Sequence, residues 1–182
     1  MISPDELVGH AKRLADAGRG HPNDADVRRG ISAAYYAVFH DLTERLSRHL
    51  VGSYPREVWN SVRRIWSHGE IERLAQEVVN RSKVLPSDPD APLPRRLGAF
   101  GPLLDVAAAD AELVAGLRLF TELQERRHMA DYDHEAIFAK SDLVEACEDA
   151  YLARERLRAA ENESRQAFFT LATVARSGSR LR

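Results

Sequence analysis

Residues 31–42 read ISAAYYAVFHDL, and this stretch decides the fold class. Its large apolar side chains recur every three or four residues, a spacing that places them on one face of an α-helix. His21-Pro22-Asn23-Asp24 is typical of a helix start, and Gly52 is a stop signal. The pattern therefore predicts a long helix that opens at residues 21–24 and stops near Gly52. Its buried face should carry Ile31, Tyr35, Val38, Leu42 and Leu46.

The rest of the chain also predicts helices, and strand-like alternation is missing. Capping boxes are expected at Ser3–Glu6 and at Ser67–Glu70, and Pro55 is suited to a helix start. Gly18 and Gly20 should end the first helix. Further helices are expected at residues 3–17, 55–67, 68–84, 105–132 and 141–175. We therefore predict an all-α protein, an antiparallel bundle of four to five helices with a long C-terminal helix.

One segment departs from this pattern. Residues 86–102 read PSDPDAPLPRRLGAFGP and hold five of the chain's eight prolines, so they cannot form a helix interior. We expect a loop insert, either a mobile excursion or a functional lid, within a single domain at 1–175. Residues 176–182 are expected to be a basic, flexible tail. The tail and Arg95-Arg96 could contact phosphate groups of a ligand, or they could serve ordinary solubility.

Composition excludes several classes of protein. The chain has 182 residues, 44% apolar residues, a net charge of −2 and one cysteine, Cys147. A disulfide framework and a CxxC zinc site are therefore excluded, and Cys147 lies on a stripe expected to be buried. No run of residues is long and apolar enough to span a membrane, and the N-terminus lacks the pattern of a secretory signal. We expect a cytoplasmic protein without a metal or other cofactor.

The segment 126–134, RRHMADYDH, concentrates groups that can do chemistry. On a continuous helix, Arg127, Asp131 and His134 are at positions i, i+4 and i+7 and share the face that carries Phe120. Arg127 could stabilise developing charge and His134 could move a proton, a combination suited to holding or cleaving a phosphodiester. The same residues could instead form a solvated helix end or an internal salt bridge.

A second cluster lies in residues 29–40. Tyr35 and Phe39 form one i,i+4 pair, and Tyr36 and His40 form the adjacent one. These side chains either pack in the core with their polar tips reaching partners, or His40 faces the same groove as Arg127.

The two clusters together resemble the HEPN domains, a family of small all-helical prokaryotic proteins. The stretch ISAAYYAVFHDL resembles the family's second-helix signature. Ser67-His68-Gly69 resembles a recurring turn of one HEPN subgroup. The segment from Arg127 to Tyr132 resembles that subgroup's Arg-x-x-Ala-Asp-Tyr motif near the end of the fourth helix. The resemblance covers roughly residues 3–160 without the proline-rich insert.

This resemblance implies a function. Many HEPN proteins are metal-independent endoribonucleases of toxin or defence type, with an Arg, a polar residue and a His separated from the Arg by four to six residues. Arg127, His128 and His134 occupy these positions, with six residues between Arg127 and His134. The implied supporting or binding residues are Asp131, Tyr132, Tyr36, His40, Arg29 and His68.

The resemblance also implies partners. Two protomers would pack their motif helices together, so that a homodimer forms one composite cleft for RNA. A nucleotidyltransferase antitoxin is an implied partner, with Tyr132 as the residue it modifies. Two alternatives remain open: a non-catalytic HEPN module that binds a nucleotide, RNA or protein, and a plain interaction protein in which the Arg127–Asp131 pair is structural.

Overall fold

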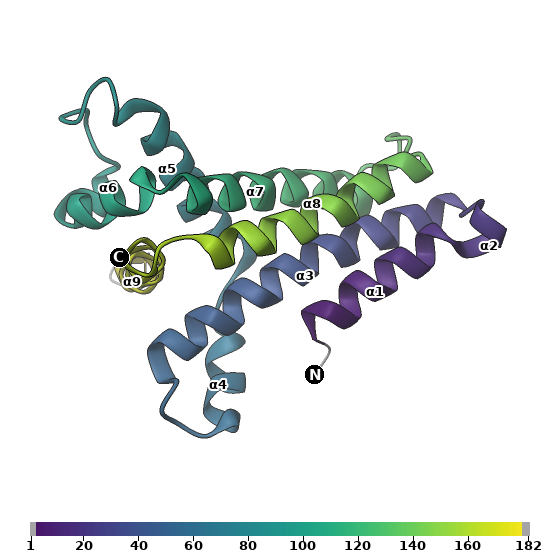
Figure 1. The fold of residues 1–182 in the computed structure, drawn as a ribbon, viewed down its shortest axis with the longest axis horizontal. Coiled ribbons are helices and arrows are strands. Elements are labelled where there is room, and N and C mark those ends of the chain that lie inside the picture. The colour runs from purple at the N-terminus through teal and green to yellow at the C-terminus, as the bar shows by residue number, and fades with distance from the viewer. Residues whose placement is uncertain (1–2, 180–182) are drawn as a thin grey trace. The chain divides into compact units, whose positions relative to one another are not determined.

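The computed structural model describes the backbone of residues 3–179 and the side chains of residues 3–174. Every regular element in this part of the chain is a helix, and there is no strand (Figure 1). None of its helices is both long and apolar enough to cross a membrane. The elements are α1 (Pro4–Ala15), α2 (Ala17–Gly20), α3 (Asp24–Val51), α4 (Arg56–Arg63), α5 (His68–Val84), the 3₁₀-helix η1 (Arg95–Phe100), α6 (Gly101–Ala109), α7 (Ala111–Tyr132), α8 (Lys140–Ala159) and α9 (Asn162–Ser179).

The chain forms two compact units. Unit 1 comprises Met1–Leu42 and Leu119–Arg154, and unit 2 comprises Thr43–Arg118 and Glu155–Arg182. Three long helices, α3, α7 and α8, contribute residues to both units. Each unit is described by itself below.

The helices of unit 1 begin at the predicted caps. The Ser3 hydroxyl accepts from the Glu6 amide at 3.2 Å, and the Glu6 carboxylate accepts from the Ser3 amide at 2.6 Å. Asn23 and Asp26 make the same reciprocal exchange at the start of α3. Gly18 and Gly20 both have positive φ, as a sharp turn after α1 requires, so the predicted end of the first helix is confirmed.

The core of unit 1 joins α3, α7 and α8. The ring of Tyr35 is fully buried and stacks on Phe39 at 6.1 Å and on Phe120 of α7 at 5.6 Å between centroids. Gly30 of α3 lies against Leu143 of α8, where an added Cβ would stand 2.4 Å from a leucine methyl carbon. The predicted buried face of α3 is confirmed, because all five of its named positions are at most 1% exposed.

In unit 2, α6 packs on α5 and α9, and α9 also contacts α5 and η1. The Ser67 hydroxyl caps α5 by accepting from the Glu70 amide, and it donates to the Glu70 carboxylate at 2.7 Å. The proline-rich segment is held against α5. Arg81 donates to the carbonyls of Pro89 and Ala91, and Arg96 in η1 forms a two-bonded ion pair with Glu77.

Two predicted helices are each broken in two. The helix expected at 105–132 is interrupted at Asp110, and the helix expected at 141–175 is interrupted between Ala159 and Asn162. Asp110 explains both breaks, because one carboxylate oxygen accepts from the Leu113 amide at 2.9 Å and the other from the Glu161 amide at 2.7 Å. Its side chain thus caps two helix starts and replaces the bonds of a continuous helix.

The C-terminal helix extends further than predicted. α9 continues to Ser179, beyond its expected end near Ala175, so the backbone of residues 176–179 is helical. The side chains from residue 175 onward and all of residues 180–182 lie outside the described part of the chain, and with them most of the predicted basic tail.

Candidate functional site

The candidate site belongs to unit 1 and lies where the last turns of α7 meet the first half of α3. Buried Ala130 anchors the end of α7, which leaves Arg127 and Asp131 on the side that meets α3. Ser32 of α3 donates its hydroxyl hydrogen to Asp131, a contact between residues far apart in sequence. Ser32 of the facing helix therefore holds the Asp131 carboxylate independently of Arg127.

Arg127 makes the central contacts of the site. Its Nε lies 2.6 Å from Oδ2 of Asp131, and its Nη2 donates to the hydroxyls of Tyr36 at 3.3 Å and Tyr132 at 3.4 Å. The side chain is 13% exposed. Nη1 makes no hydrogen bond within the described part of the chain. The guanidinium is therefore fixed on two sides and retains donor hydrogens for a further partner.

Planar groups extend from Arg127 in both directions. The guanidinium carbon lies 5.6 Å from the centre of the Tyr36 ring and 5.3 Å from that of the Tyr132 ring. Tyr36 in turn stacks on His40 at 6.0 Å, and His128 contacts Tyr132 at 5.0 Å. The predicted Tyr36–His40 pair is confirmed as a ring contact. The result is a continuous row of planar side chains, which we call the planar row: His128, Tyr132, Arg127, Tyr36 and His40.

The surroundings keep Arg127 charged. Burial, the largest single influence on its pKa, disfavours the guanidinium, but Tyr36, Asp131 and Tyr132 together more than offset this. The pKa of Arg127 is accordingly raised above its ordinary value. A permanent positive charge in a fixed orientation is what recognition of an anionic group needs.

His134 does not share the face of Arg127 and Asp131 as the spacing predicted. α7 ends at Tyr132, and His134 stands in the following loop, exposed and without a hydrogen bond or ion pair in the described part of the chain. The physical reason is the Asp133 carboxylate, which accepts from the amides of Glu135 and Ala136 and closes a turn. A wheel drawn on a continuous helix therefore does not describe position 134.

Two other predicted residues are not part of the planar row. Arg29 is exposed on α3 and has no hydrogen bond or ion pair in the described part of the chain. His68 is the first residue of α5 and belongs to unit 2. The structure thus brings Arg127, His128, Asp131, Tyr132, Tyr36 and His40 together in unit 1.

Sequence reasoning missed two residues of the site, Ser32 and Arg28. The Arg28 guanidinium donates to carbonyl oxygens at the end of α7 and in the loop after it, over 102 to 108 residues of sequence. The Asp24–Arg28 spacing of four residues was a visible signal for an ion pair on α3. No pattern in the sequence pointed to the carbonyls.

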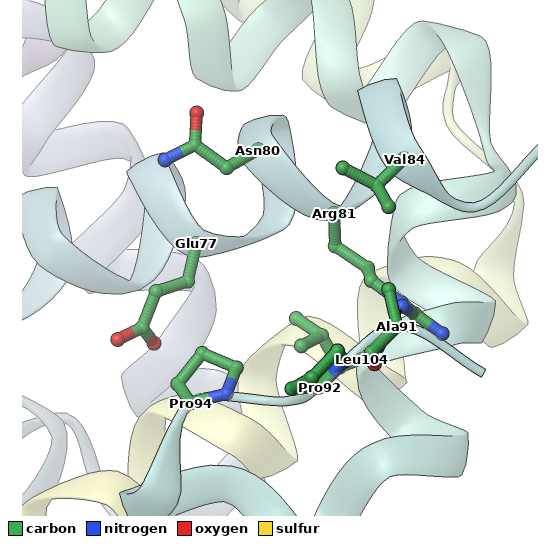
Figure 2. A pocket seen from close by; sticks show the side chains of 8 residues that line it. All are labelled: Glu77, Asn80, Arg81, Val84, Ala91, Pro92, Pro94 and Leu104. Atoms are coloured by element: carbon green, nitrogen blue, oxygen red, sulfur yellow. Dashed lines mark hydrogen bonds between the residues drawn. The ribbon is translucent and has the colours of Figure 1, made fainter. Parts of the chain in front are cut away.

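A cavity of about 190 Å³ lies in unit 2, outside this site (Figure 2). It lies between α5 and the proline-rich segment, with the side chains of Glu77 and Arg81 directed toward that segment and Asn80 directed away from it. The cavity is smaller than the roughly 300 Å³ at which ligand pockets begin. Its two charged groups already form ion pairs: Arg81 lies 2.6 Å from Asp105, and Glu77 pairs with Arg96.

The candidate site contains no arrangement of metal ligands. Within the described part of the chain, no group of three or more His, Cys, Asp and Glu side chains is placed to hold a metal ion. Comparison of the chain with protein-family models, with curated proteins and with solved structures returned no match.

Proposed function

We propose that this protein is a HEPN-type helical bundle that acts on RNA as a metal-independent endoribonuclease, with Arg127 holding the reacting phosphate. The observation that carries the proposal is the state of the Arg127 guanidinium. It is charged, oriented by Asp131 and two tyrosines, and retains Nη1 for a partner. Such a preorganised donor stabilises negative charge without the cost of reorganisation when the charge develops.

The planar row favours RNA over a simple anion. Unpaired bases stack on aromatic rings and on arginine planes, and single-stranded RNA is recognised largely in this way. Tyr132 is 61% exposed and His128 is exposed beside it, so this end of the row is open to a base. A phosphate at Nη1 and a base on Tyr132 are compatible with one nucleotide.

The reaction in this proposal is an internal transfer at phosphorus. The 2′-oxygen of the RNA attacks the adjacent phosphorus while the bond to the 5′-oxygen breaks. A base removes the proton of the 2′-hydroxyl, and an acid supplies a proton to the departing 5′-oxygen, so no net proton is consumed. His134 acts as acid or base, Arg127 stabilises the charge on the phosphoryl oxygens, and His128 orients the RNA backbone. The products are a 2′,3′-cyclic phosphate and a 5′-hydroxyl.

A second copy of the chain completes the site in this proposal. Exposed apolar side chains surround the end of α7, with Met129 at 42%, Tyr132 at 61% and Ile137 at 95% exposure. Covering them with the same surface of a partner would bury apolar area and bring two Arg127 side chains to one cleft. The exposed Tyr132 hydroxyl is also the group that a nucleotidyltransferase partner would modify.

Binding of RNA or a nucleotide without cleavage is the second candidate function. The observation that favours it is the position of His134, which lies beyond the end of α7 and has no contact that orients it toward Arg127. In this case Arg127 and the planar row hold the ligand, and no group is placed to move the proton.

Cleavage of a structured RNA in EDTA by the purified protein tests the proposal. Arg127→Ala and His134→Ala should abolish cleavage while the helical circular dichroism spectrum is retained. The matched controls are Arg13→Ala and His10→Ala, two exposed positions of unit 1, which should cleave as the wild type does. Cleavage that persists in Arg127→Ala refutes the proposal. Arg127-dependent binding without cleavage selects the second candidate.

A further inference from the structure

Both terminal nitrogens of Arg28 bind the end of α7 and the loop that follows. Nη1 donates to the carbonyl of Ala130 at 3.1 Å and to that of Asp133 at 2.8 Å, and Nη2 donates to the carbonyl of Ala136. Nε pairs with Asp24 of the same helix at 2.7 Å. The side chain is 17% exposed. One guanidinium therefore joins α3 to three points of the 130–136 backbone.

These contacts satisfy groups that the helix cannot satisfy itself. The last carbonyls of a helix have no intrahelical partners, and they carry the negative end of the helix dipole. A cation that donates to them stabilises the helix end, and hydrogen bonds from a charged donor are stronger than neutral ones. The planar fork of Arg28 donates to these carbonyls from two separate nitrogens, whereas a lysine ammonium has all its donors on one nitrogen.

Further contacts hold the loop. The Arg28 guanidinium carbon lies 5.1 Å from the centre of the Phe138 ring. The Asp133 carboxylate accepts from the amides of Glu135 at 2.9 Å and Ala136 at 3.1 Å. The backbone on both sides of His134 is thus bonded, whereas the imidazole itself is exposed. The position of His134 is set by its backbone, and the backbone is set in large part by Arg28.

We infer that Arg28 is a positioning residue that fixes the loop 133–139 and thereby the place of His134 relative to Arg127. The inference rests on the proposed function for its catalytic consequence. Arg28 touches neither the planar row nor the proposed phosphate site on Arg127 in any contact described above. Its loss should therefore lower the rate of the chemical step and leave RNA affinity nearly unchanged.

Arg28→Lys is the decisive variant, because it retains the charge and removes the fork. We expect single-turnover cleavage of the structured RNA to slow by at least about tenfold, since small misplacements of a catalytic group are costly. The Kd for the RNA should stay within about twofold, because Arg127 is intact. Hydrogen exchange at the amides of Glu135 and Ala136 should accelerate by about tenfold as the turn opens more often. Arg13→Lys, an exposed position of unit 1, is the matched control.

Cleavage by the wild type tests the proposed nuclease, and the amide exchange rates test the role of Arg28. Cleavage and amide exchange at wild-type rates in Arg28→Lys overturn the inference. A wild type that does not cleave refutes the nuclease, and the exchange rates then still decide whether Arg28 holds the loop. If Arg28→Lys does not fold, Asp24→Asn replaces it, since it removes only the charge that pairs with Nε, at a residue 62% exposed. Asp24→Asn should show smaller changes in the same direction, and unchanged exchange and cleavage in that variant also overturn the inference.

Discussion

Asp131→Asn should separate the stability of the candidate site from its affinity for RNA. Asparagine has nearly the shape of aspartate and can still bond to Ser32, but it removes the charge that faces Arg127. The protein should therefore become less stable. Because the guanidinium is then no longer neutralised, its attraction for a phosphate should be retained or increased.

The contacts at Arg127 set the size of the expected decrease in the free energy of unfolding. Its Nε lies 2.6 Å from the Asp131 carboxylate, and the two side chains are 13% and 28% exposed, so the pair is partly shielded from water. A partly buried ion pair of this kind contributes about 2 kcal/mol, between the values for exposed and for fully buried pairs. For a chain of this length, that loss lowers Tm by about 4–8 °C.

Thermal unfolding followed by circular dichroism, together with RNA binding in EDTA, measures both effects. Arg127→Ala should show a similar loss of stability but should bind RNA about tenfold more weakly, the equivalent of one charge-assisted hydrogen bond. Glu135→Gln, an exposed carboxylate in the neighbouring loop, is the control and should melt within about 1 °C of the wild type. A wild-type Tm for Asp131→Asn would refute the reasoning on stability. Wild-type RNA affinity for Arg127→Ala would refute the reasoning on binding.

Three further predictions follow from single side chains. Burial raises the pKa of the Cys147 thiol, so the fold favours the neutral thiol. The resulting contribution to the free energy of unfolding is complete below the ordinary pKa and is lost as the pH rises through the raised pKa. The unfolding free energy should therefore fall more steeply above about pH 9 in the wild type than in Cys147→Ala, and parallel curves would contradict this. Asp110→Ala should cost about 2 kcal/mol, or about 1 kcal/mol for each helix start that it caps, whereas exposed Asp90→Ala should cost nothing measurable in the same melting experiment. Arg81→Gln should cost about 2 kcal/mol, because it removes a buried, charged donor from its hydrogen bonds to Asp105 and to the carbonyls of Pro89 and Ala91. Faster trypsin cleavage at Arg95 would report release of the proline-rich segment, and an unchanged cleavage rate would show that Arg81 does not hold it.

Local chemistry made most of the helices predictable. Ser3, Asn23 and Ser67 cap the helices that follow them, and each acts on amides within three residues of itself. The buried face of α3 followed from spacing alone, because a helix places every third or fourth side chain on one side. The breaks at Asp110 and after Ala159 were missed. The carboxylate of Asp110 reaches the start of α9 only through the packing of α6 on α9.

The candidate site was predictable in part. Arg127 and Asp131 are four residues apart on one helix, so their ion pair follows from the sequence. The contact of Tyr36 with Arg127 depends on how α3 packs against α7. The sequence does not show which residues of these two helices face each other. His134 was misplaced because helix periodicity was extended past the residue at which the helix ends.

The sequence by itself determined that this chain is helical, where most helices begin, and which face of α3 is buried. These properties depend on interactions within one or two helical turns, which residue order specifies directly. Only the tertiary structure decided which polar groups meet. Arg28 binds backbone carbonyls, and every residue has the same carbonyl, so no residue pattern identifies its partners. The loop that carries His134 is therefore a product of packing between α3 and α7, and not of its own sequence alone.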